Sequence, residues 1–420
     1  MLCIDLFAGC GGLALGLSRA GFKGVFAVER DPMAFDTLKK NLVDEGSPFQ
    51  SFRDWPEWLP QTNLDLSDLL ADADMKEKLR SLRGAVDLVS GGPPCQGFSA
   101  GGRRDGEDER NTLVFRMLDF IDLVEPRAVL IENVEGIARK FVSRPNARSS
   151  EGSVAEAVAE MLRSRGYTSC IRLLDATEFG VPQTRKRVVI FGVKVDAQPV
   201  ELDRMFADAL KSASFSVRSK YGLPLDRPVT LWEAIHDLAS TERLICPDST
   251  GYETAPYSKA NSAFARAMRG EVKETPNSHR FSKHGARVTA LYELAHRTQE
   301  KGRLSKAFLL ANNTKKDKKV LLDPDLPTST ITTHPDEFIH CTQARNVTVR
   351  EMARLQSFPD DFHFFGRYTI NGPRRKFDVA RCSQVGNAVP PLMAEAIGQA
   401  VLATLDALTS NEAGLRVRAA

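Results

Sequence analysis

The stretch Ile4-Asp5-Leu6-Phe7-Ala8-Gly9-Cys10-Gly11-Gly12-Leu13-Ala14 decides the fold class of this chain. Its first four residues predict a strand, and Leu13 begins a helical pattern that continues to residue 20. The glycines between them fit the G-x-G-x-x-G/A pattern of a turn so tight that side chains would clash with a bound ligand. The sequence therefore predicts a strand, a close glycine turn and a helix.

An acidic residue follows this turn at the spacing that the pattern requires. Residues 25–28 predict the next strand, and Glu29 ends it 20 residues after Gly9. A carboxylate at that place accepts hydrogen bonds from ribose hydroxyls. The pattern alone does not separate a dinucleotide from S-adenosylmethionine, since both carry an adenosine, and a plain glycine-rich turn is the alternative to either.

Short apolar runs alternate with helical patterns over the first 195 residues. Strands of nearly continuous apolar residues, separated by helices, predict a parallel sheet covered on both faces. The predicted fold class is α/β, a doubly wound Rossmann-like sheet whose ligands lie beyond the carboxyl ends of the strands. Further strands are expected at residues 87–90, 128–131 and 187–193, and helices at 114–124, 155–165 and 392–408.

The sequence changes in character near residue 196, where periodicity weakens and Pro, Gly, Ser and polar residues accumulate. Sheet-like sequence returns near residue 379. We therefore expect one domain in residues 1–195 plus 377–420 and a second, smaller, irregular domain in residues 196–376.

Composition is that of an ordinary globular protein, with 42% hydrophobic and 26% charged residues and a net charge of +3. The charge is unevenly distributed, because residues 196–376 hold 28 basic and 22 acidic side chains, a net charge of +6. A basic segment in an otherwise slightly acidic chain is typical of a polyanion-binding module, and solvated charged faces are the alternative.

Seven cysteines without a Cys-x-x-Cys pair argue against a disulfide framework and a Cys-rich zinc site. The seven histidines show no His-Glu-x-x-His spacing, so no metal site is expected. No run approaches the roughly 18 apolar residues of a membrane span, and no leader pattern opens the chain. We expect no membrane association, and a cytoplasmic or nuclear location.

One cysteine stands out because of its neighbours. The stretch Gly91-Gly92-Pro93-Pro94-Cys95-Gln96 directly follows a predicted strand, where active sites of α/β proteins gather. The prolines stiffen the approach to Cys95, so we interpret it as the working thiol and Cys10 as incidental to the glycine turn. A small buried hydrophobe is the usual alternative for a lone cysteine.

Two further groups carry ionisable side chains at strand ends. Glu132 follows the apolar run 128–131, where a partly desolvated carboxylate suits proton sharing, although capping the next helix is the alternative. Arg185 and Arg187 precede a strand, and alternation predicts that they point to one side, toward a phosphate or a base edge. A solvated edge strand is the alternative there.

Two late segments have predicted structural roles. Residues 345–359 predict a helix whose Arg and Glu side chains form ion pairs within the protein. Gly386, which precedes the last helix, predicts a close backbone approach.

Taken together and in this order, these segments resemble the DNA (cytosine-5)-methyltransferases, in particular the single-chain bacterial and phage enzymes. The resemblance covers about residues 1–195 and 340–401. It implies S-adenosylmethionine as cofactor and S-adenosylhomocysteine as product. It also implies cofactor contacts at Phe7, Ala8, Gly9, Gly11, Gly12, Leu13, Glu29, Asp65, Pro94, Leu113, Asn387 and Ala388.

The resemblance also implies a mechanism in which the target cytosine is flipped out of double-stranded DNA. Cys95 would add to ring carbon 6, and Glu132 would hold the ring nitrogen and the exocyclic amine. Arg187 would position the pyrimidine carbonyl and Arg185 the adjoining phosphate. A lid bearing Ser99 and Arg103 would close over the base before carbon 5 is methylated to give 5-methylcytosine.

By the same resemblance, residues 196–376 contain the target-recognition, DNA-binding region. The implied setting is a prokaryotic cytoplasm, at the nucleoid, in a restriction-modification system with a cognate restriction endonuclease as functional partner. The implied state on DNA is a monomer.

One departure from the family pattern concerns Arg30, which stands where some members place an aromatic or apolar residue against the adenine. The sequence offers three alternatives to the DNA enzyme. A tRNA cytosine-5 methyltransferase usually carries a Cys-Phe-Thr tripeptide and a short recognition region, which this chain lacks. A catalytically silent DNA-binding relative conflicts with intact Cys95, Glu132 and Arg187. A nicotinamide oxidoreductase accounts only for the segment from Gly9 to Glu29.

Overall fold

The computed structural model describes residues 1–94, 112–139, 152–195, 198–314, 318–368 and 378–419. Their contacts divide the chain into two compact units. Unit 1 comprises Met1–Asp175, Lys186–Ser216 and Ala394–Ala420, and unit 2 comprises Ala176–Arg185 and Val217–Met393. The expected boundaries at 196 and 377 differ from these, since 176–185 and 377–393 belong to unit 2 and 196–216 belong to unit 1. The assignment of a task to each unit stays a prediction.

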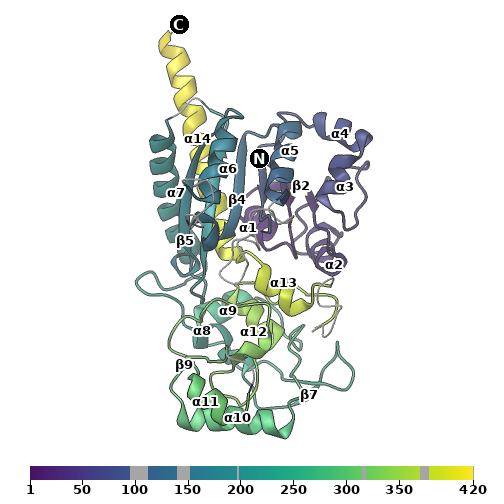
Figure 1. Cartoon of the computed structure of the whole chain (residues 1–420), viewed down its shortest axis with the longest axis vertical. Coiled ribbons are helices and arrows are strands. Elements are labelled where there is room, and N and C mark those ends of the chain that lie inside the picture. Colours follow the sequence, from purple (N-terminus) through teal and green to yellow (C-terminus); the bar gives the residue numbers. More distant parts are fainter. Residues whose placement is uncertain (95–111, 140–151, 196–197, 315–317, 369–377, 420) are drawn as a thin grey trace, which may run out of the picture. The chain divides into compact units, whose positions relative to one another are not determined.

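Unit 1 is built on a six-stranded sheet in the order β2-β1-β3-β4-β6-β5 (Figure 1). The strands β2, β1, β3 and β4 pair in parallel, as predicted. The strands are β1 (Leu2–Leu6), β2 (Lys23–Val28), β3 (Leu88–Gly91), β4 (Ala128–Val134), β5 (Thr168–Asp175) and β6 (Lys186–Val193).

The expectation of a wholly parallel sheet is wrong at β6, which runs antiparallel to both β4 and β5. The connection from β5 to β6 is the short segment Ala176–Arg185, whose one described helix is the single turn η4 (Ala176–Phe179). A parallel pair needs a longer crossover, usually a helix, so a connection of this length favours an antiparallel return. The same pairing reveals β5, a strand that sequence periodicity missed. It lies at the sheet edge, and its Leu173 is 51% exposed.

Both faces of the central strands are covered, as the predicted doubly wound fold requires. In β4, every residue from Ala128 to Asn133 is buried, although successive side chains point to opposite faces. Helices account for this cover (Figure 1). On one of them, Gly16 approaches α14 so closely that a Cβ there would lie 2.3 Å from that of Ala394. The helices are α1 (Gly12–Ala20), α2 (Pro32–Leu38), η1 (Lys39–Val43), α3 (Leu66–Ala71), α4 (Ala73–Arg80), α5 (Thr112–Val124), η3 (Glu135–Ala138), α6 (Val154–Arg163), α7 (Pro199–Lys220) and α14 (Pro391–Ala419).

The helical run Arg381–Ser410 is the single part of the described chain that is long and apolar enough to cross a membrane. Of its most apolar window, 78% is buried inside the protein, as in the core helix of a globular fold.

Unit 2 is the smaller unit and is irregular, with short helices and two-residue strands. Its elements include a parallel and an antiparallel pairing around β10 and a separate β7–β8 hairpin. They are α8 (Leu231–Ile235), η5 (His236–Leu238), β7 (Leu244–Ile245), β8 (Glu253–Thr254), α9 (Ala263–Arg269), α10 (Ala286–Thr298), β9 (Gly302–Arg303), α11 (Lys306–Ala311), β10 (Val320–Leu321), η6 (Pro335–Glu337), β11 (Phe338–Ile339), α12 (Val349–Leu355) and α13 (Arg381–Asn387).

Candidate active site

The strand register of unit 1 brings three predicted site segments to one edge of the sheet. Leu6 of β1 pairs with Gly91 of β3, and Gly91 pairs with Ile131 of β4. Because these strands are parallel, the glycine turn, the segment leading to Cys95, and Glu132 all lie at their carboxyl ends. The antiparallel strand β6 enters the same edge, where Arg187 pairs with Val134. This edge is where ligands bind in doubly wound folds.

The glycine turn has the backbone that the sequence predicted. Phe7, Gly9 and Gly11 have positive φ angles of 56°, 57° and 93°. At Gly9, no atom lies within 4 Å of the position that a Cβ would take, so the turn leaves room for a ligand. At Gly11, a Cβ would lie 2.5 Å from Leu42 Cδ1, so the turn also packs closely against the residues that follow α2.

Glu29 ties the end of β2 to this turn. Its Oε2 accepts a hydrogen bond from the Gly9 N–H at 2.9 Å, and its Oε1 accepts one from the Asp31 N–H at 2.7 Å. Burial raises the pKa of Glu29, although these backbone donors oppose the shift. A carboxylate oxygen that accepts one hydrogen bond keeps a lone pair for a second, so a ribose hydroxyl remains compatible with this geometry.

Asp65 is held beside Glu29 through the backbone. The Leu64 N–H donates to the Glu29 carbonyl at 2.8 Å, and Asn63 Nδ2 donates to the Arg30 carbonyl at 3.0 Å. The Asp65 carboxylate accepts from the Ser67 N–H and begins α3. Two half-buried acids beside an open glycine turn suit the hydroxyl and amino groups of an adenosine, so the residues present fit the cofactor that the resemblance implies. Arg30 is exposed, and Phe7 is half-buried.

Asp5 is a functional candidate that sequence reasoning passed over. It is fully buried one strand position before Leu6, and its Oδ1 accepts a 2.8 Å hydrogen bond from Ser90 Oγ of β3. Burial raises its pKa to about 7. The sequence feature that could have identified Asp5 is an acidic residue within an otherwise apolar predicted strand. Asp5 thus links the strand before the glycine turn to the strand before the Cys95 segment.

Glu132 and Arg187 form an ion pair at the carboxyl end of β4. Arg187 Nε lies 2.8 Å from Glu132 Oε1, and the two side chains are 12% and 10% exposed. Within the described residues, Glu132 Oε1 is buried without a partner in hydrogen-bond geometry. The pair is therefore oriented and partly desolvated, with hydrogen-bonding capacity left over.

The backbone before Cys95 is fixed against β4. Asn133 Nδ2 donates to the Pro93 carbonyl at 2.8 Å, and a Cβ on Gly92 would lie 3.2 Å from Glu132 Oε2. Because Gly92 has no side chain, the Glu132 carboxylate can lie close to its backbone. In the sequence, the Gly91-Gly92 pair is the feature that indicates this close approach. Cys95 itself lies outside the described residues, as do Ser99 and Arg103. Pro94 and Leu113, which border that gap, are half-buried.

Arg185 has an environment that disagrees with the predicted phosphate contact. It is 1% exposed, and its guanidinium donates to the carbonyls of Ile331 (3.2 Å), Gly386 (2.9 Å) and Ala388 (3.1 Å). A guanidinium buried against carbonyls inside unit 2 cannot also face a solvent-side phosphate. The strand that carries Arg187 begins only at Lys186, so alternation does not extend to Arg185, and its phosphate contact stays a prediction.

The segment that Arg185 holds contains two predicted cofactor residues. Asn387 is exposed and Ala388 half-buried, both in unit 2. The predicted close approach at Gly386 is confirmed, because a Cβ there would lie 2.5 Å from the Thr332 carbonyl oxygen.

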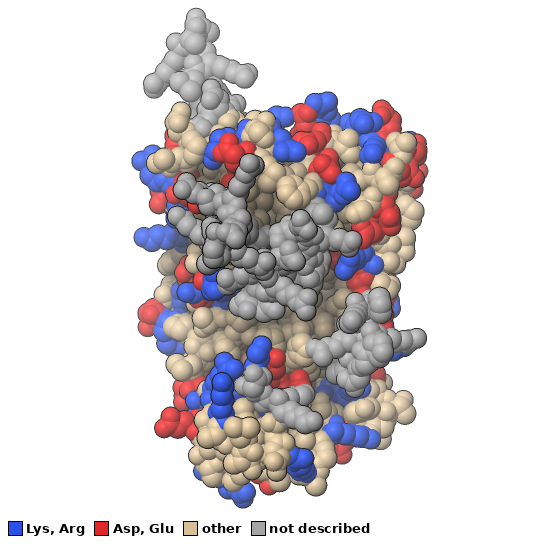
Figure 2. Space-filling model, viewed as in Figure 1, with Lys and Arg blue, Asp and Glu red and all other residues tan. Residues whose placement is uncertain are grey.

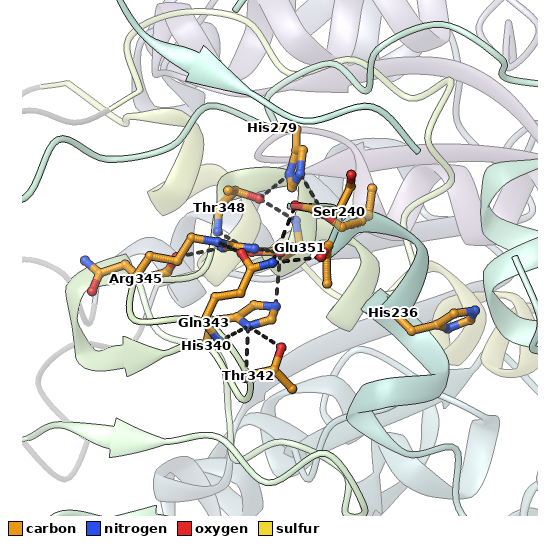
Figure 3. A network of polar contacts seen from close by, with 12 residues as sticks. His236, Ser240, His279, His340, Thr342, Gln343, Arg345, Thr348 and Glu351 are labelled. Carbon is orange, nitrogen blue, oxygen red and sulfur yellow. Dashed lines mark hydrogen bonds and ion pairs between the residues drawn. The ribbon is translucent and has the colours of Figure 1, made fainter. Parts of the chain in front are cut away.

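The predicted structural role of residues 345–359 is confirmed, although the helix is only α12 (Val349–Leu355). Figure 3 shows Arg345 laid against Glu351, whose Oε1 and Oε2 accept from its two terminal nitrogens at 2.6 and 2.8 Å. Arg354 bridges Asp237 and Asp360, and both partners are fully buried. Among the described residues there is no group of His, Cys, Asp and Glu that could hold a metal ion.

Comparison with known proteins agrees with this geometry. A sequence model of the C-5 cytosine-specific DNA methylases matches residues 1–403. Type II methyltransferase M.DdeI of Desulfomicrobium norvegicum is 30% identical over 407 residues, covering 96% of this chain and 88% of the relative. Type II methyltransferase M1.HphI of Haemophilus parahaemolyticus is 29% identical, covering 95% and 86%. These relatives do not favour the tRNA alternative.

The fold has a solved counterpart in a protein encoded within an E. coli prophage and proposed to be a DNA modification methyltransferase. It superposes with a TM-score of 0.63 at 24% identity and covers 97% of this chain and 99% of that one. This likeness supports the fold, and the family match implies the use of S-adenosylmethionine. The chain belongs to the C-5 cytosine-specific DNA methylase family and is a DNA (cytosine-5) methyltransferase.

Proposed function

We propose that Glu132 and Arg187 hold a flipped cytosine of double-stranded DNA while Cys95 attacks it. The observation that carries this proposal is the oriented Glu132–Arg187 pair, with Nε and Oε1 2.8 Å apart, beside the anchored backbone of Gly92 and Pro93. The base has to leave the stack because its ring atoms are unreachable inside the duplex.

Addition of Cys95 begins the reaction. A bond forms between the Cys95 sulfur and ring carbon 6, and the ring electrons shift toward nitrogen 3. Glu132 supplies the proton that nitrogen 3 then takes, so carbon 5 becomes the electron-rich carbon of an enamine. Covalent addition divides one difficult alkylation into easier steps.

Arg187 orients two hydrogen-bond acceptors, the Glu132 carboxyl group and the carbonyl of the pyrimidine. Its guanidinium holds the Glu132 carboxyl group and faces the pyrimidine carbonyl, which fixes the ring plane. Glu132 also accepts from the exocyclic amine, a group that uses the hydrogen-bonding capacity left at its carboxylate.

The glycine turn, Phe7, Glu29 and Asp65 would hold the adenosine part of S-adenosylmethionine. This cofactor supplies a methyl group activated by a sulfonium, which carbon 5 takes. Water takes the proton of carbon 5, the double bond between carbons 5 and 6 forms again, and the Cys95 sulfur leaves as a thiolate. Nitrogen 3 returns its proton to Glu132. The products are 5-methylcytosine and S-adenosylhomocysteine.

We further propose that the protein acts as a monomer on DNA, in the cytoplasm at the nucleoid, and protects sites that a cognate restriction endonuclease would cut. The names of its relatives as type II methyltransferases support this setting.

The test is covalent trapping on DNA in which 5-fluorocytosine replaces cytosine. Fluorine at carbon 5 cannot leave as a proton does, so the Cys95 adduct cannot resolve. With S-adenosylmethionine present, the wild-type protein should form a complex that survives denaturation. Cys95→Ala should form none.

The matched control is Cys170→Ala, because Cys170 is buried in β5 and burial raises the pKa of its thiol to about 12. This variant should trap DNA as the wild type does. Trapping by Cys95→Ala, or loss of trapping in both variants, would refute the assignment of the nucleophile.

A further inference from the structure

Two carboxyl groups of unit 1 are buried beside the glycine turn, and they differ in their hydrogen-bond partners. Glu29 accepts backbone N–H groups at both oxygens, from Gly9 and from Asp31. Asp5, in β1, accepts at Oδ1 from the Ser90 hydroxyl at 2.8 Å. Its Oδ2 is buried and has no hydrogen-bond partner among the described residues. An ionised Glu29 is therefore better stabilised than an ionised Asp5.

Several acidic side chains of this unit lie at the surface beside a cation. Glu77 pairs with Arg80 and Asp119 with Arg116. Figure 2 shows Asp and Glu next to Lys and Arg over the upper part of the view, where Figure 1 places α3 and α4. Asp5 is instead fully buried, and no described cation lies within ion-pair distance of it. An anion in such a place is costly, so the carboxyl group tends to take up a proton.

Asp5 is the member of the two that carries this proton near neutral pH. Burial raises the pKa of Asp5 to about 7, while the Ser90 hydrogen bond opposes the shift and the charge of Glu29 adds to it. Burial also raises the pKa of the Cys10 thiol to about 12 and that of the Cys3 thiol well above its usual range, so both thiols stay neutral. Among the described residues, the charged group that acts on Asp5 is thus Glu29.

A charge bound at the glycine turn would act on Asp5. Asp5 lies two residues before Phe7, where the backbone of the turn takes its first positive φ, 56°. Glu29, whose charge acts on Asp5, is hydrogen-bonded to the turn at Gly9. Residues 3–6 are all buried, so the effect of such a charge passes through protein and is little screened by water.

The cofactor and its product differ in charge at one atom. S-adenosylmethionine carries a positive sulfonium, and S-adenosylhomocysteine has a neutral sulfur in its place. A nearby cation favours the ionised form of a carboxyl group. We propose that Asp5 releases its proton to the solvent when S-adenosylmethionine binds at the glycine turn, and that it thereby favours the charged cofactor over its product. The proposal rests on the binding of this cofactor at the turn.

Calorimetric titration in buffers of different ionisation enthalpy measures the protons released on binding. If the sulfonium lowers the pKa of Asp5 by about 1, the low end of the effect of a close opposite charge, the wild type should release about 0.4 more protons than Asp5→Asn on binding S-adenosylmethionine at pH 7. With S-adenosylhomocysteine the two proteins should release equal numbers. Asparagine keeps the size of the side chain and an acceptor for Ser90, and changes in the ligand's own protonation are common to both proteins.

The same titrations give the preference between the two ligands. At pH 8, the ratio of the affinity for S-adenosylmethionine to that for S-adenosylhomocysteine should be about ninefold lower in Asp5→Asn than in the wild type. At pH 6, where Asp5 stays largely protonated in the free protein, the ratio should be only about twofold lower.

Asp87→Asn is the matched control, because Asp87 accepts from the Leu2 N–H at the other end of the β1–β3 pair. It should keep the wild-type proton release and preference. Ser90→Ala removes a donor to Asp5 and should move the pH of maximal proton release upward.

Equal proton release by the wild type and Asp5→Asn, an equal loss in Asp87→Asn, or an unchanged pH of maximal release in Ser90→Ala would overturn the proposal. If S-adenosylmethionine does not bind to the wild type at all, that result would instead contradict the proposed cofactor site.

Discussion

Two buried carboxylate–guanidinium pairs in this protein differ in how completely they are satisfied. In unit 2, both Glu351 oxygens accept from Arg345, Oε2 also accepts from the Thr348 N–H at 2.7 Å, and Glu351 is fully buried. In unit 1, Glu132 Oε1 lies 2.8 Å from Arg187 Nε, and among the described residues this buried oxygen has no partner in hydrogen-bond geometry.

This difference separates a structural pair from a reactive one. A buried charge normally acquires all the partners that it can use, because an unsatisfied one is costly. The pair around Glu351 follows this rule and stabilises α12. The pair around Glu132 departs from it at the carboxyl edge of the sheet, where we propose that a bound cytosine supplies the missing partners.

The largest expected effect is on turnover. Glu132→Gln removes the proton donor to the ring and should lower the rate of methyl transfer by about 10²- to 10⁴-fold, with little change in the denaturation midpoint. Steady-state kinetics on unmethylated DNA give the rate. Glu135→Gln, an exposed carboxylate in η3, is the control and should act as the wild type does. Retained turnover in Glu132→Gln would remove the distinction between the two pairs.

The next effect is on stability. Glu351→Gln leaves Arg345 as a buried charge without its counter-ion and should lower the free energy of unfolding by about 3–5 kcal/mol. Urea denaturation of the full chain measures it. Replacing both partners by apolar residues, Arg345→Met with Glu351→Leu, should recover much of that loss. A loss below about 1 kcal/mol in Glu351→Gln would show that this pair is not structural.

A pH effect should follow from the histidines beside the Glu351 pair. Burial lowers the pKa of His340 to about 3 and that of His279 to about 4, while the charge of Glu351 opposes both shifts and that of Arg345 reinforces them. Because both values lie below the unfolded pKa of about 6.5, the stability that these neutral histidines provide is complete above pH 6.5. It is lost progressively as the pH falls toward 4 and 3.

The urea midpoint of the wild type should therefore decrease from pH 7 to pH 5. His340→Gln should show a shallower decrease over this interval. The prediction fails if the midpoint is constant between these pH values.

The smallest effect concerns Arg185. Arg185→Lys keeps the charge but loses the guanidinium fork that holds the carbonyls of Gly386 and Ala388, beside the predicted cofactor residue Asn387. Loss of one hydrogen bond of about 1 kcal/mol corresponds to an approximately fivefold weaker affinity for S-adenosylmethionine. Calorimetry measures this affinity. If Arg185→Lys instead reduces the salt dependence of DNA binding and leaves the cofactor affinity unchanged, that result would support the predicted phosphate contact of Arg185, against which its burial argues.

Local sequence patterns predicted the parts of the site that depend on neighbours along the chain. The strand, glycine turn and helix from Ile4 to Ala20, with Glu29 after the next strand, follow from periodicity and spacing. The positive φ angles at Gly9 and Gly11 follow from the same pattern.

Features that depend on tertiary contacts were not predictable in this way. An apolar run does not reveal strand direction, so the antiparallel β6 was missed, and the half-exposed edge strand β5 lacks the continuous apolar pattern. The burial of Arg185 comes from carbonyls contributed by distant segments of unit 2. The Asp5–Ser90 bond likewise depends on the register of β1 with β3.

Exchange of the hydrogen on carbon 5 of cytosine tests the central claim most directly. Addition of Cys95, with proton delivery by Glu132, makes carbon 5 basic even without a methyl donor, so DNA tritiated at that carbon should release tritium to water. We predict release by the wild type and by Glu135→Gln, none by Cys95→Ala, and a rate reduced about 10²-fold or more in Glu132→Gln. Release by Glu132→Gln at the wild-type rate would contradict the assignment of the Glu132–Arg187 pair as the cytosine site.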